Sequence, residues 1–288
     1  MFGRFSRQVA LFGESGQELI RAARVVVVGA GGLGSHVVQQ LALLGAGHIS
    51  VVDAEELDDT NKNRYVTARF DDPVPGTKKV DIACRLIKSI DPSIEAKAIP
   101  MSLVMPASIN AIVRATHVVG CVDSEGARLV MNEMCAAYKV PFVDMATDIL
   151  PEDQVRYGGR VCISTWEEAG CLACRGLIDF EEAQLDLLPS AAKRDRDRIY
   201  GVERSMLSRS GPSVVSINGV VASLGVTELM VMMTRLRKPM PISTYYGNSG
   251  KVTVNVDVPG GDCYYCNGVR GSGIEADLER YAREGILI

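Results

Sequence analysis

The stretch Val25–Ser35 reads VVVVGAGGLGS, and it decides the fold. Four β-branched residues run into Gly29, Gly31 and Gly34, which have the G-x-G-x-x-G spacing, and the helix-like run LGSHVVQQLALLG follows at once. In this kind of turn the first glycine makes the bend, the second lets phosphate approach the backbone, and the third lets the helix pack on its strand. Unpaired N–H groups and the positive end of the helix dipole favour an anion there. The stretch therefore predicts a strand, a phosphate-binding turn and a helix.

Asp53 makes this prediction more specific. It ends the next apolar run, HISVVD, 24 residues after Gly29, where a second strand should end. A carboxylate at that position can hold the hydroxyl groups of a ribose. A lone G-x-G-x-x-G is weak evidence, but the order strand, turn, helix, strand and aspartate is specific. The sequence therefore indicates a nucleotide-binding protein.

Composition and charge exclude several classes of protein. The chain has 288 residues, of which 47% are hydrophobic, and this is enough for one large α/β core with an appendage or for two domains. A net charge of −4 argues against binding to nucleic acid through its phosphates. The N-terminus is too polar for a secretory leader, and polar residues within Ser213–Met233 favour a core helix over a membrane span. We expect a soluble, cytoplasmic protein with neither nucleic acid nor membrane as a partner.

Strand-like and helix-like stretches alternate up to about residue 147. Strands are predicted at 24–29, 48–53, 94–99, 117–122 and 141–146, and helices at 33–45, 77–90, 106–115 and 126–139. This alternation is typical of a Rossmann-like, doubly wound, mostly parallel sheet with helices on both faces. We expect a single domain over residues 1–288, with a nucleotide-binding α/β core over 1–150 and the remaining elements over 151–288.

The second half of the chain is predicted to add antiparallel strands. GGRVCIST indicates one strand, and STYYGN and KVTVNVDV indicate a hairpin that turns at Ser249-Gly250. A long apolar helix is expected at 213–235 and a short helix at 274–284. Residues 179–211 are charged and irregular, which predicts a mobile or partner-dependent loop.

Four of the eight cysteines form two C-x-x-C pairs. Cys171 and Cys174 lie in GCLACRG, Cys263 and Cys266 lie in DCYYCNG, and 88 residues separate the pairs. Each pair can place two thiolates on one tetrahedral ion, which predicts a zinc site that joins distant segments. A redox pair and unrelated free thiols are the alternatives, although a redox motif needs only one such pair. The other cysteines are expected in the core: Cys84, Cys121, Cys135 and Cys162.

Polar residues beyond the glycine turn distinguish between nucleotides. Asn61, Arg64 and Asp123 map to the carboxyl edge of the predicted sheet, and Lys79 lies in the first turn of a helix beside it. Two cations and a carboxylate suit a triphosphate with Mg²⁺, because Arg and Lys neutralise phosphate and a hard metal ion prefers oxygen ligands. A hydride-transfer enzyme has no need of this cluster.

These motifs resemble those of the ThiF/MoeB-type enzymes and of the adenylation domain of ubiquitin-activating enzymes. RFSRQ near the start is similar to the family's R-Y-x-R-Q, DDTNKNRY to its S-N-L-x-R-Q, GTKKV to its G-x-x-K-V, and CVDSEGAR to its D-x-x-D-N-x-x-x-R. Both C-x-x-C pairs fall where the family binds structural zinc. The resemblance covers nearly the whole chain and rests on several motifs in the same order.

The resemblance implies a function and a role for each matching residue. Family members use ATP to adenylate the C-terminal glycine carboxylate of a ubiquitin-like or sulfur-carrier protein, and pyrophosphate is released. The implied phosphate cradle is Gly29, Gly31, Gly32 and Gly34. The other implied roles are ribose binding by Asp53, β/γ-phosphate binding by Asn61, Arg64 and Lys79, Mg²⁺ binding by Asp123, and reach into the partner subunit of a homodimer by Arg7.

The sequence also departs from the family. Ser124 replaces the asparagine after the Mg²⁺ aspartate, and Gly120 replaces an earlier aspartate. No cysteine lies between Cys174 and Cys263, so a cysteine thioester on the crossover loop at about 176–212 is excluded. The acyl-adenylate then passes directly to another molecule, such as a conjugating enzyme, or to a serine of that loop. Ser205, Ser208 and Ser210 are candidates beside Arg204 and Arg209, although ordinary surface serines explain them more simply.

The sequence therefore predicts an ATP-dependent, zinc-containing, homodimeric carrier-protein adenylyltransferase. A relative that activates a small-molecule or tRNA-borne carboxylate is the closest alternative. A NAD-dependent oxidoreductase would share the glycine turn and Asp53 but would leave Arg64, Lys79 and Asp123 without a role. A non-catalytic scaffold would keep the fold and lose the polar cluster, which is nearly complete here.

Overall fold

The chain folds around one mixed β-sheet, and the computed structural model describes residues 3–150, 155–167, 170–189, 212–257, 259 and 262–286. The strands lie in the order β3-β2-β1-β4-β5-β6-β7-β8. Neighbours from β3 to β5 are parallel, and β6, β7 and β8 continue the sheet antiparallel. The predicted parallel core with an antiparallel extension is confirmed. The strands are β1 (Arg24–Val28), β2 (His48–Val52), β3 (Glu95–Ile99), β4 (His117–Gly120), β5 (Phe142–Leu150), β6 (Arg156–Ser164), β7 (Ile242–Tyr246) and β8 (Lys251–Asn255).

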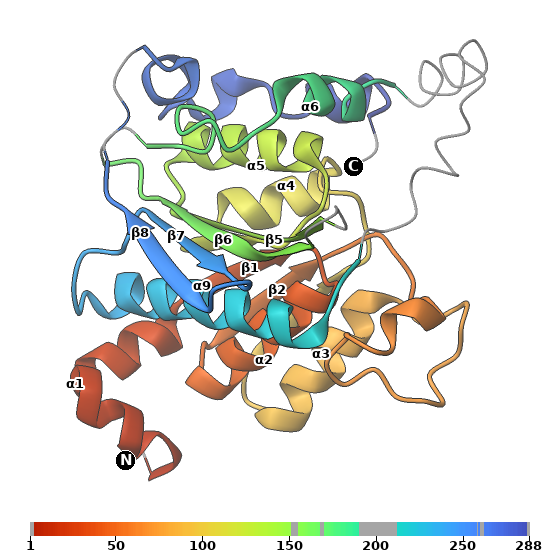
Figure 1. Ribbon diagram of the computed structural model, residues 1–288, viewed down its shortest axis with the longest axis vertical. Helices are drawn as coiled ribbons and strands as arrows, with labels where there is room; N and C mark the ends of the chain where they lie inside the picture. Colours follow the sequence, from red (N-terminus) through yellow and green to blue (C-terminus); the bar gives the residue numbers. More distant parts are fainter. Residues whose placement is uncertain are drawn as a thin grey trace.

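At its centre the sheet is apolar on both faces, because alternate residues of a strand point to opposite sides and β1 carries four consecutive valines. In β1, Val25 and Val27 pack with α2, α3 and α9, whereas Val26 and Val28 pack with α4 and α5. Figure 1 shows α4, α5 and α6 on one side of the sheet and α2, α3 and α9 on the other. The helices of these two layers are α2 (Gly32–Leu44), α3 (Lys79–Ile90), α4 (Pro106–Val113), α5 (Glu125–Tyr138), α6 (Phe180–Asp186) and α9 (Val215–Thr234).

The long apolar helix α9 is a core helix, as predicted. By length and apolar composition it is the one helix among the described residues that could cross a membrane. It packs instead on α2, β5 and β6, and on the N-terminal helix α1 (Ser6–Ala22). Gly225 allows this close packing, since a Cβ added there would lie 2.1 Å from the Met145 methyl group. The helix is therefore half-buried against the sheet, and this explains why its apolar sequence also contains polar residues.

The N-terminal helix α1 (Ser6–Ala22) was not expected from the sequence. Its glycines weaken the helical pattern, and Gly13 has φ +75°, so the helix is kinked there. Phe12 and Ile20 are buried, and the helix packs against α9. Tertiary contacts thus stabilise a segment whose local sequence does not favour a continuous helix.

Two predictions in the second half are corrected by the structure. Residues 179–211 were expected to form an irregular loop, but α6 occupies Phe180–Asp186, and Asp179 caps it by accepting bonds from the N–H groups of Glu181 and Glu182. Residues 190–211 of the predicted loop lie outside the described residues. The helix expected at 274–284 is also wrong: a 3₁₀ turn at Gly273–Ala276 and α10 (Arg280–Arg283) are separated by Asp277, whose φ is +45°.

Candidate functional site

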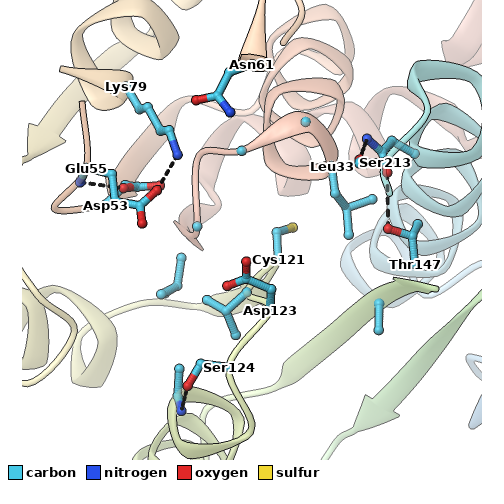
Figure 2. A pocket seen from close by; sticks show the side chains of 18 of the residues that line it. Leu33, Asp53, Glu55, Asn61, Lys79, Cys121, Asp123, Ser124, Thr147 and Ser213 are labelled. Carbon is cyan, nitrogen blue, oxygen red and sulfur yellow. Dashed lines mark hydrogen bonds and ion pairs between the residues drawn. The ribbon is translucent and has the colours of Figure 1, made fainter. Parts of the chain in front are cut away.

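A cavity of about 740 Å³ opens at the carboxyl ends of the parallel strands. Residues following β1, β2 and β4 line it, together with the second half of β5 and the start of α9. Figure 2 shows polar side chains from these separate elements pointing into it. Its volume lies within the range of about 300–1,000 Å³ that is typical of small-molecule sites.

The glycine turn forms one wall of the cavity. Gly29 has φ +90°, and a Cβ added there would lie 2.5 Å from the carbonyl oxygen of Cys121. A Cβ at Gly34 would lie 1.9 Å from the carbonyl oxygen of Gly29, so both positions require glycine. At Gly31, by contrast, an added Cβ would meet no atom within 4 Å. Gly31 precedes the first turn of α2, whose N–H groups have no partner within the helix, so the open space beside it fits a phosphate.

Asp53 lies at the end of β2 and faces this turn. Its Oδ2 accepts a bond from the N–H of Ala30 at 2.7 Å, and its Oδ1 accepts one from the N–H of Glu55 at 2.8 Å. Burial raises the pKa of the Asp53 carboxyl above its ordinary value, and the Lys79 ammonium opposes this shift. The carboxylate is therefore fixed beside the turn, with lone pairs left for further donors such as hydroxyl groups.

Lys79, Asn61 and Arg64 approach the turn from the segment that follows β2. Lys79 begins α3, its side chain is 9% exposed, and its ammonium forms an ion pair with Glu55. Asn61 belongs to a capped 3₁₀ turn, in which its Oδ1 accepts a bond from the N–H of Asp58 at 3.1 Å. The Arg64 guanidinium donates to the carbonyl of Thr60, and its Cγ lies beside Gly32, 3.1 Å from the position of an added Cβ.

Asp123 enters the cavity from the opposite side, between β4 and α5, and is exposed. The two residues beside it are held in place. The carbonyl of Val122 accepts a bond of 2.7 Å from the Arg128 guanidinium. Ser124 caps α5, and its Oγ accepts a bond of 3.2 Å from the N–H of Ala127. The glycine turn and the five polar residues predicted from the sequence thus line one cavity: Asp53, Asn61, Arg64, Lys79 and Asp123.

A third wall was not predicted, and it consists of neutral polar side chains. Thr147 Oγ1 donates to Asn218 Oδ1 at 3.1 Å, and Asn218 Nδ2 donates to Ser213 Oγ at 3.1 Å. Asn218 also lies against the turn, since its Nδ2 is 2.5 Å from a Cβ added at Gly32. The position of Thr147, directly after the strand predicted at 141–146, could have indicated this wall, because ligands bind at the carboxyl ends of parallel strands. Asn218 could not be found because only the crossing of α9 brings it here. Glu55, the partner of Lys79, was also missed.

Of the other predicted catalytic residues, the structure describes only Arg7. Arg7 is exposed on α1 and is absent from the described residues that line this cavity. In Figure 1, α1 extends from the lower edge of the molecule, on the α9 side of the sheet. Ser205 and Ser208 lie outside the described residues, as do Ser210, Arg204 and Arg209.

The two C-x-x-C pairs come together. Cys171 Sγ lies 3.6 Å from Cys263 Sγ, Cys174 Sγ lies 4.0 Å from Cys266 Sγ, and all four sulfurs lie within 4.8 Å of one another. Tetrahedral zinc with Zn–S bonds of about 2.3 Å separates its sulfurs by about 3.8 Å, so this set fits the ion. Four thiolates would leave no open position on the metal, which is the pattern of structural sites.

The other four cysteines behave as core residues to different degrees. Cys135 and Cys162 are buried, as predicted, whereas Cys84 and Cys121 are half-buried. Burial raises the pKa of Cys162 to about 12 and that of Cys84 to about 11, so these thiols stay protonated near neutral pH. Cys121 lines the cavity, and burial raises its pKa as well. These three thiols are thus poor nucleophiles.

Comparison with known proteins gives a consistent picture. The ThiF family model matches residues 5–253. The adenylyltransferase and sulfurtransferase UBA4 of Yarrowia lipolytica is 31% identical over 166 residues, which are 56% of this chain and 41% of that protein. The molybdopterin-synthase adenylyltransferase of Escherichia coli is 27% identical over 241 residues, which are 82% of this chain and 84% of that protein. This chain thus spans about two fifths of UBA4 but most of the bacterial enzyme.

Solved structures share the fold. The crystal structure of E. coli MccB with ATP has a TM-score of 0.68 and 20% sequence identity, and the match covers 92% of this chain and 74% of that one. At this identity the likeness extends to the fold alone.

Proposed function

Because the chain belongs to the ThiF family, as its motifs predicted, we propose that it uses ATP and Mg²⁺ to adenylate a carboxylate. The proposed substrate is the C-terminal glycine carboxylate of a ubiquitin-like or sulfur-carrier protein. One observation carries this proposal: a single cavity brings together the glycine turn, two cationic side chains and an exposed aspartate. Relatives named for the sulfur carrier ThiS and for SAMP support the class of substrate.

Each side of the cavity then has a proposed role. The open space at Gly31 and the first turn of α2 receive phosphates, and Asp53 holds the ribose. Lys79, Arg64 and Asn61 neutralise and orient the β- and γ-phosphates. Lys79 must exchange its ion pair with Glu55 for phosphate oxygens, and Glu55 is free to move away because its side chain is 73% exposed.

The reaction needs charge neutralisation and positioning, not a side-chain nucleophile. A carboxylate oxygen of the carrier attacks the α-phosphorus of ATP, and the bond from that phosphorus to the β-phosphate bridge oxygen breaks. Pyrophosphate leaves, and a mixed anhydride with AMP remains on the carrier. Lys79 and Arg64 stabilise the charge that develops on the leaving phosphates. Asp123 would hold Mg²⁺, which supplies further neutralisation of the triphosphate when bound.

The cysteines support a proposal for the fate of the acyl-adenylate. No cysteine lies between Cys174 and Cys263, and burial raises the pKa values of the Cys84, Cys121 and Cys162 thiols, which disfavours their nucleophilic thiolate forms. We therefore propose direct transfer of the acyl group to a second molecule. An oxyester on Ser205, Ser208 or Ser210 is the alternative route within the chain, and hydroxylamine-sensitive, thiol-resistant labelling by the carrier would identify it.

The proposal is tested by ATP–pyrophosphate exchange with candidate carrier proteins. We expect exchange only with a carrier present, and none in Asp123→Ala, because the triphosphate then repels the attacking carboxylate. Arg64→Ala and Lys79→Ala should each lower kcat/KM, and the decrease should correspond to a loss of about 2–4 kcal/mol of transition-state stabilisation. The matched control for Asp123→Ala is Glu284→Ala, which removes an exposed carboxylate that does not line this cavity. Wild-type exchange in Asp123→Ala would contradict the metal assignment, and exchange with a small carboxylic acid alone would reassign the substrate.

A further inference from the structure

Helix α6 is docked on the first turn of α5, directly beside Asp123. Its last residue, Asp186, reaches that turn although it is 60 positions further along the chain than Gly126. Asp186 Oδ2 accepts a bond of 2.8 Å from Ser124 Oγ and a second of 3.1 Å from the N–H of Gly126. A Cβ added at Gly126 would lie 2.6 Å from the Asp186 Cβ, so this approach requires glycine in α5.

The Ser124 hydroxyl joins the two helices. Its oxygen accepts a bond from the N–H of Ala127 while its proton is donated to Asp186. Its rotamer is therefore fixed from both sides. Since Ser124 directly follows Asp123, the contact with Asp186 restricts the backbone on the C-terminal side of the exposed aspartate. A carboxylate at this place is also favoured by the unpaired N–H groups and dipole of α5.

A second set of contacts runs from the start of α6 to the other side of Asp123. The N–H of Asp179 donates to Glu125 Oε2 at 3.1 Å, and Glu125 forms an ion pair with Arg128. Arg128 in turn donates to the carbonyl of Val122 at 2.7 Å, and it is 7% exposed. Both neighbours of Asp123 are thus connected to α6, one through each end of that helix.

We propose that docking of α6 sets the position of the Asp123 loop, and that Asp186 is the positioning residue responsible. Asp186 does not touch the nucleotide; it acts through Ser124. This inference rests on the proposed function, in which Asp123 holds the Mg²⁺ of Mg-ATP. It assigns a role to Ser124, which replaces the family's asparagine: Ser124 connects Asp186 to the Asp123 loop. It also makes the affinity for Mg-ATP depend on the segment that follows the first C-x-x-C pair.

Calorimetric titration of the full chain with ATP, with and without Mg²⁺, tests the inference. We expect Asp186→Ala to weaken Mg-ATP binding roughly tenfold, about the effect of losing one hydrogen bond to a charged group. Metal-free ATP binding should be unchanged, because the glycine turn, Asp53 and Lys79 are untouched. Gly126→Ala should give the same pattern by a steric route, without weakening α5 itself.

The controls separate positioning from general damage. Gln184→Ala alters an exposed residue of the same helix and should bind like the wild type. Asp186→Asn keeps an oxygen acceptor for Gly126 and should recover most of the lost affinity. The double variant Ser124→Ala/Asp186→Ala should bind Mg-ATP no more weakly than the single variant with the lower affinity. Both changes break the same hydrogen bond, so their effects should not add.

Two results would overturn the inference. One is folded Asp186→Ala and Gly126→Ala proteins that bind Mg-ATP like the wild type. The other is an equal loss of ATP affinity with and without Mg²⁺ in these variants, which would indicate general destabilisation. If Asp186→Ala does not fold, Gly126→Ala and Ser124→Ala give the same comparison. A wild-type protein that gains no affinity from Mg²⁺ would instead refute the metal assignment of the proposed function, and this inference with it.

Discussion

Gly31 and Gly34 belong to the same turn but face opposite surroundings. Gly34 lies against the backbone, since a Cβ there would be 1.9 Å from the carbonyl oxygen of Gly29. Gly31 lies against open cavity, and its φ of −80° and ψ of −158° suit any residue. Gly34 is therefore needed for folding, and Gly31 is needed only for a ligand that approaches the backbone closely.

Alanine substitutions should separate these two needs. We expect Gly34→Ala to lower the free energy of unfolding by about 1–3 kcal/mol or more, the usual effect of overpacking. Gly31→Ala should leave the melting temperature unchanged and lower ATP affinity by a similar free energy, because its methyl group occupies the phosphate position. Thermal unfolding and ATP titration of both variants provide the measurement. A Gly31→Ala protein with normal ATP affinity would place the phosphates elsewhere.

The residues that the sequence identified share a simple geometric property. Asp53 directly follows β2, Asp123 lies in the connection between β4 and α5, and Lys79 begins a helix, so chain order alone brings them to one edge of the sheet. Asn218 has no such relation to a strand end. It reaches the cavity because α9 crosses the sheet, and the position of a returning helix is set by tertiary packing that periodicity does not report.

At the level of elements, an ion pair fastens the segment between β2 and α3. Asp72 Oδ1 and Oδ2 each accept a bond of 2.7 Å from Arg85 of α3, and Oδ2 also accepts one of 2.7 Å from the N–H of Arg69. This segment carries Asn61 and Arg64. The Arg85 guanidinium and these hydrogen bonds lower the pKa of Asp72 to about 2 from the ordinary 3.8.

This shift predicts how stability depends on pH. The folded state holds the ionised carboxylate more strongly than the unfolded state, so the stabilisation is complete above about pH 5 and is lost as pH falls from about 4 to 2. Asp72→Asn should lower the free energy of unfolding by about 1–3 kcal/mol at neutral pH, and the difference from wild type should shrink across that acid range. Denaturant unfolding at several pH values measures it, with the exposed neighbour Asp71→Asn as control. A difference that does not change with pH would exclude the ion pair as its cause.

The mispredicted elements are the ones with weak local signals. Helix α6 is short and charged, and Ala183 is its one buried residue, so no apolar stripe indicated a helix. Its stability comes from the Asp179 cap and from Asp186 at α5. The segment after residue 273 does contain helical turns, but Asp277 adopts a left-handed conformation and divides them. Long periodic helices such as α3 were predicted because their own residues determine them.

For the whole molecule, the four cysteines predict a metal content. We expect one zinc ion per chain, and a chelator that removes it should lower stability by roughly 5 kcal/mol or more, because structural zinc sites bind with about 10 kcal/mol or more. Cys171→Ser should have the same effect, whereas Cys84→Ser should keep the metal. Elemental analysis and thermal unfolding give the readouts. Freshly purified protein without zinc would contradict the prediction.

The proposed homodimer makes a further prediction through Arg7. The Arg7 side chain is exposed on α1 and is not among the described residues that line its own chain's cavity, and we predict that it completes the site of a partner subunit. Arg7→Ala and Asp123→Ala homodimers should then both be inactive in pyrophosphate exchange. After subunit exchange, a mixture should recover activity, since each heterodimer has one intact composite site. Verified heterodimers without activity would remove Arg7 from the neighbouring site.

The position of α9 also has a consequence during protein synthesis. The parallel strands and the helices α2 to α5 are complete by residue 150, but α9, which covers β5 and β6 on the α2 side, begins only at Val215. Until then, Val143, Met145 and Val161 lack their cover on that face. A nascent chain that folds as it emerges therefore exposes this apolar surface while dozens of further residues are translated. We expect products of premature termination before α9 to bind chaperones or to aggregate through this apolar surface.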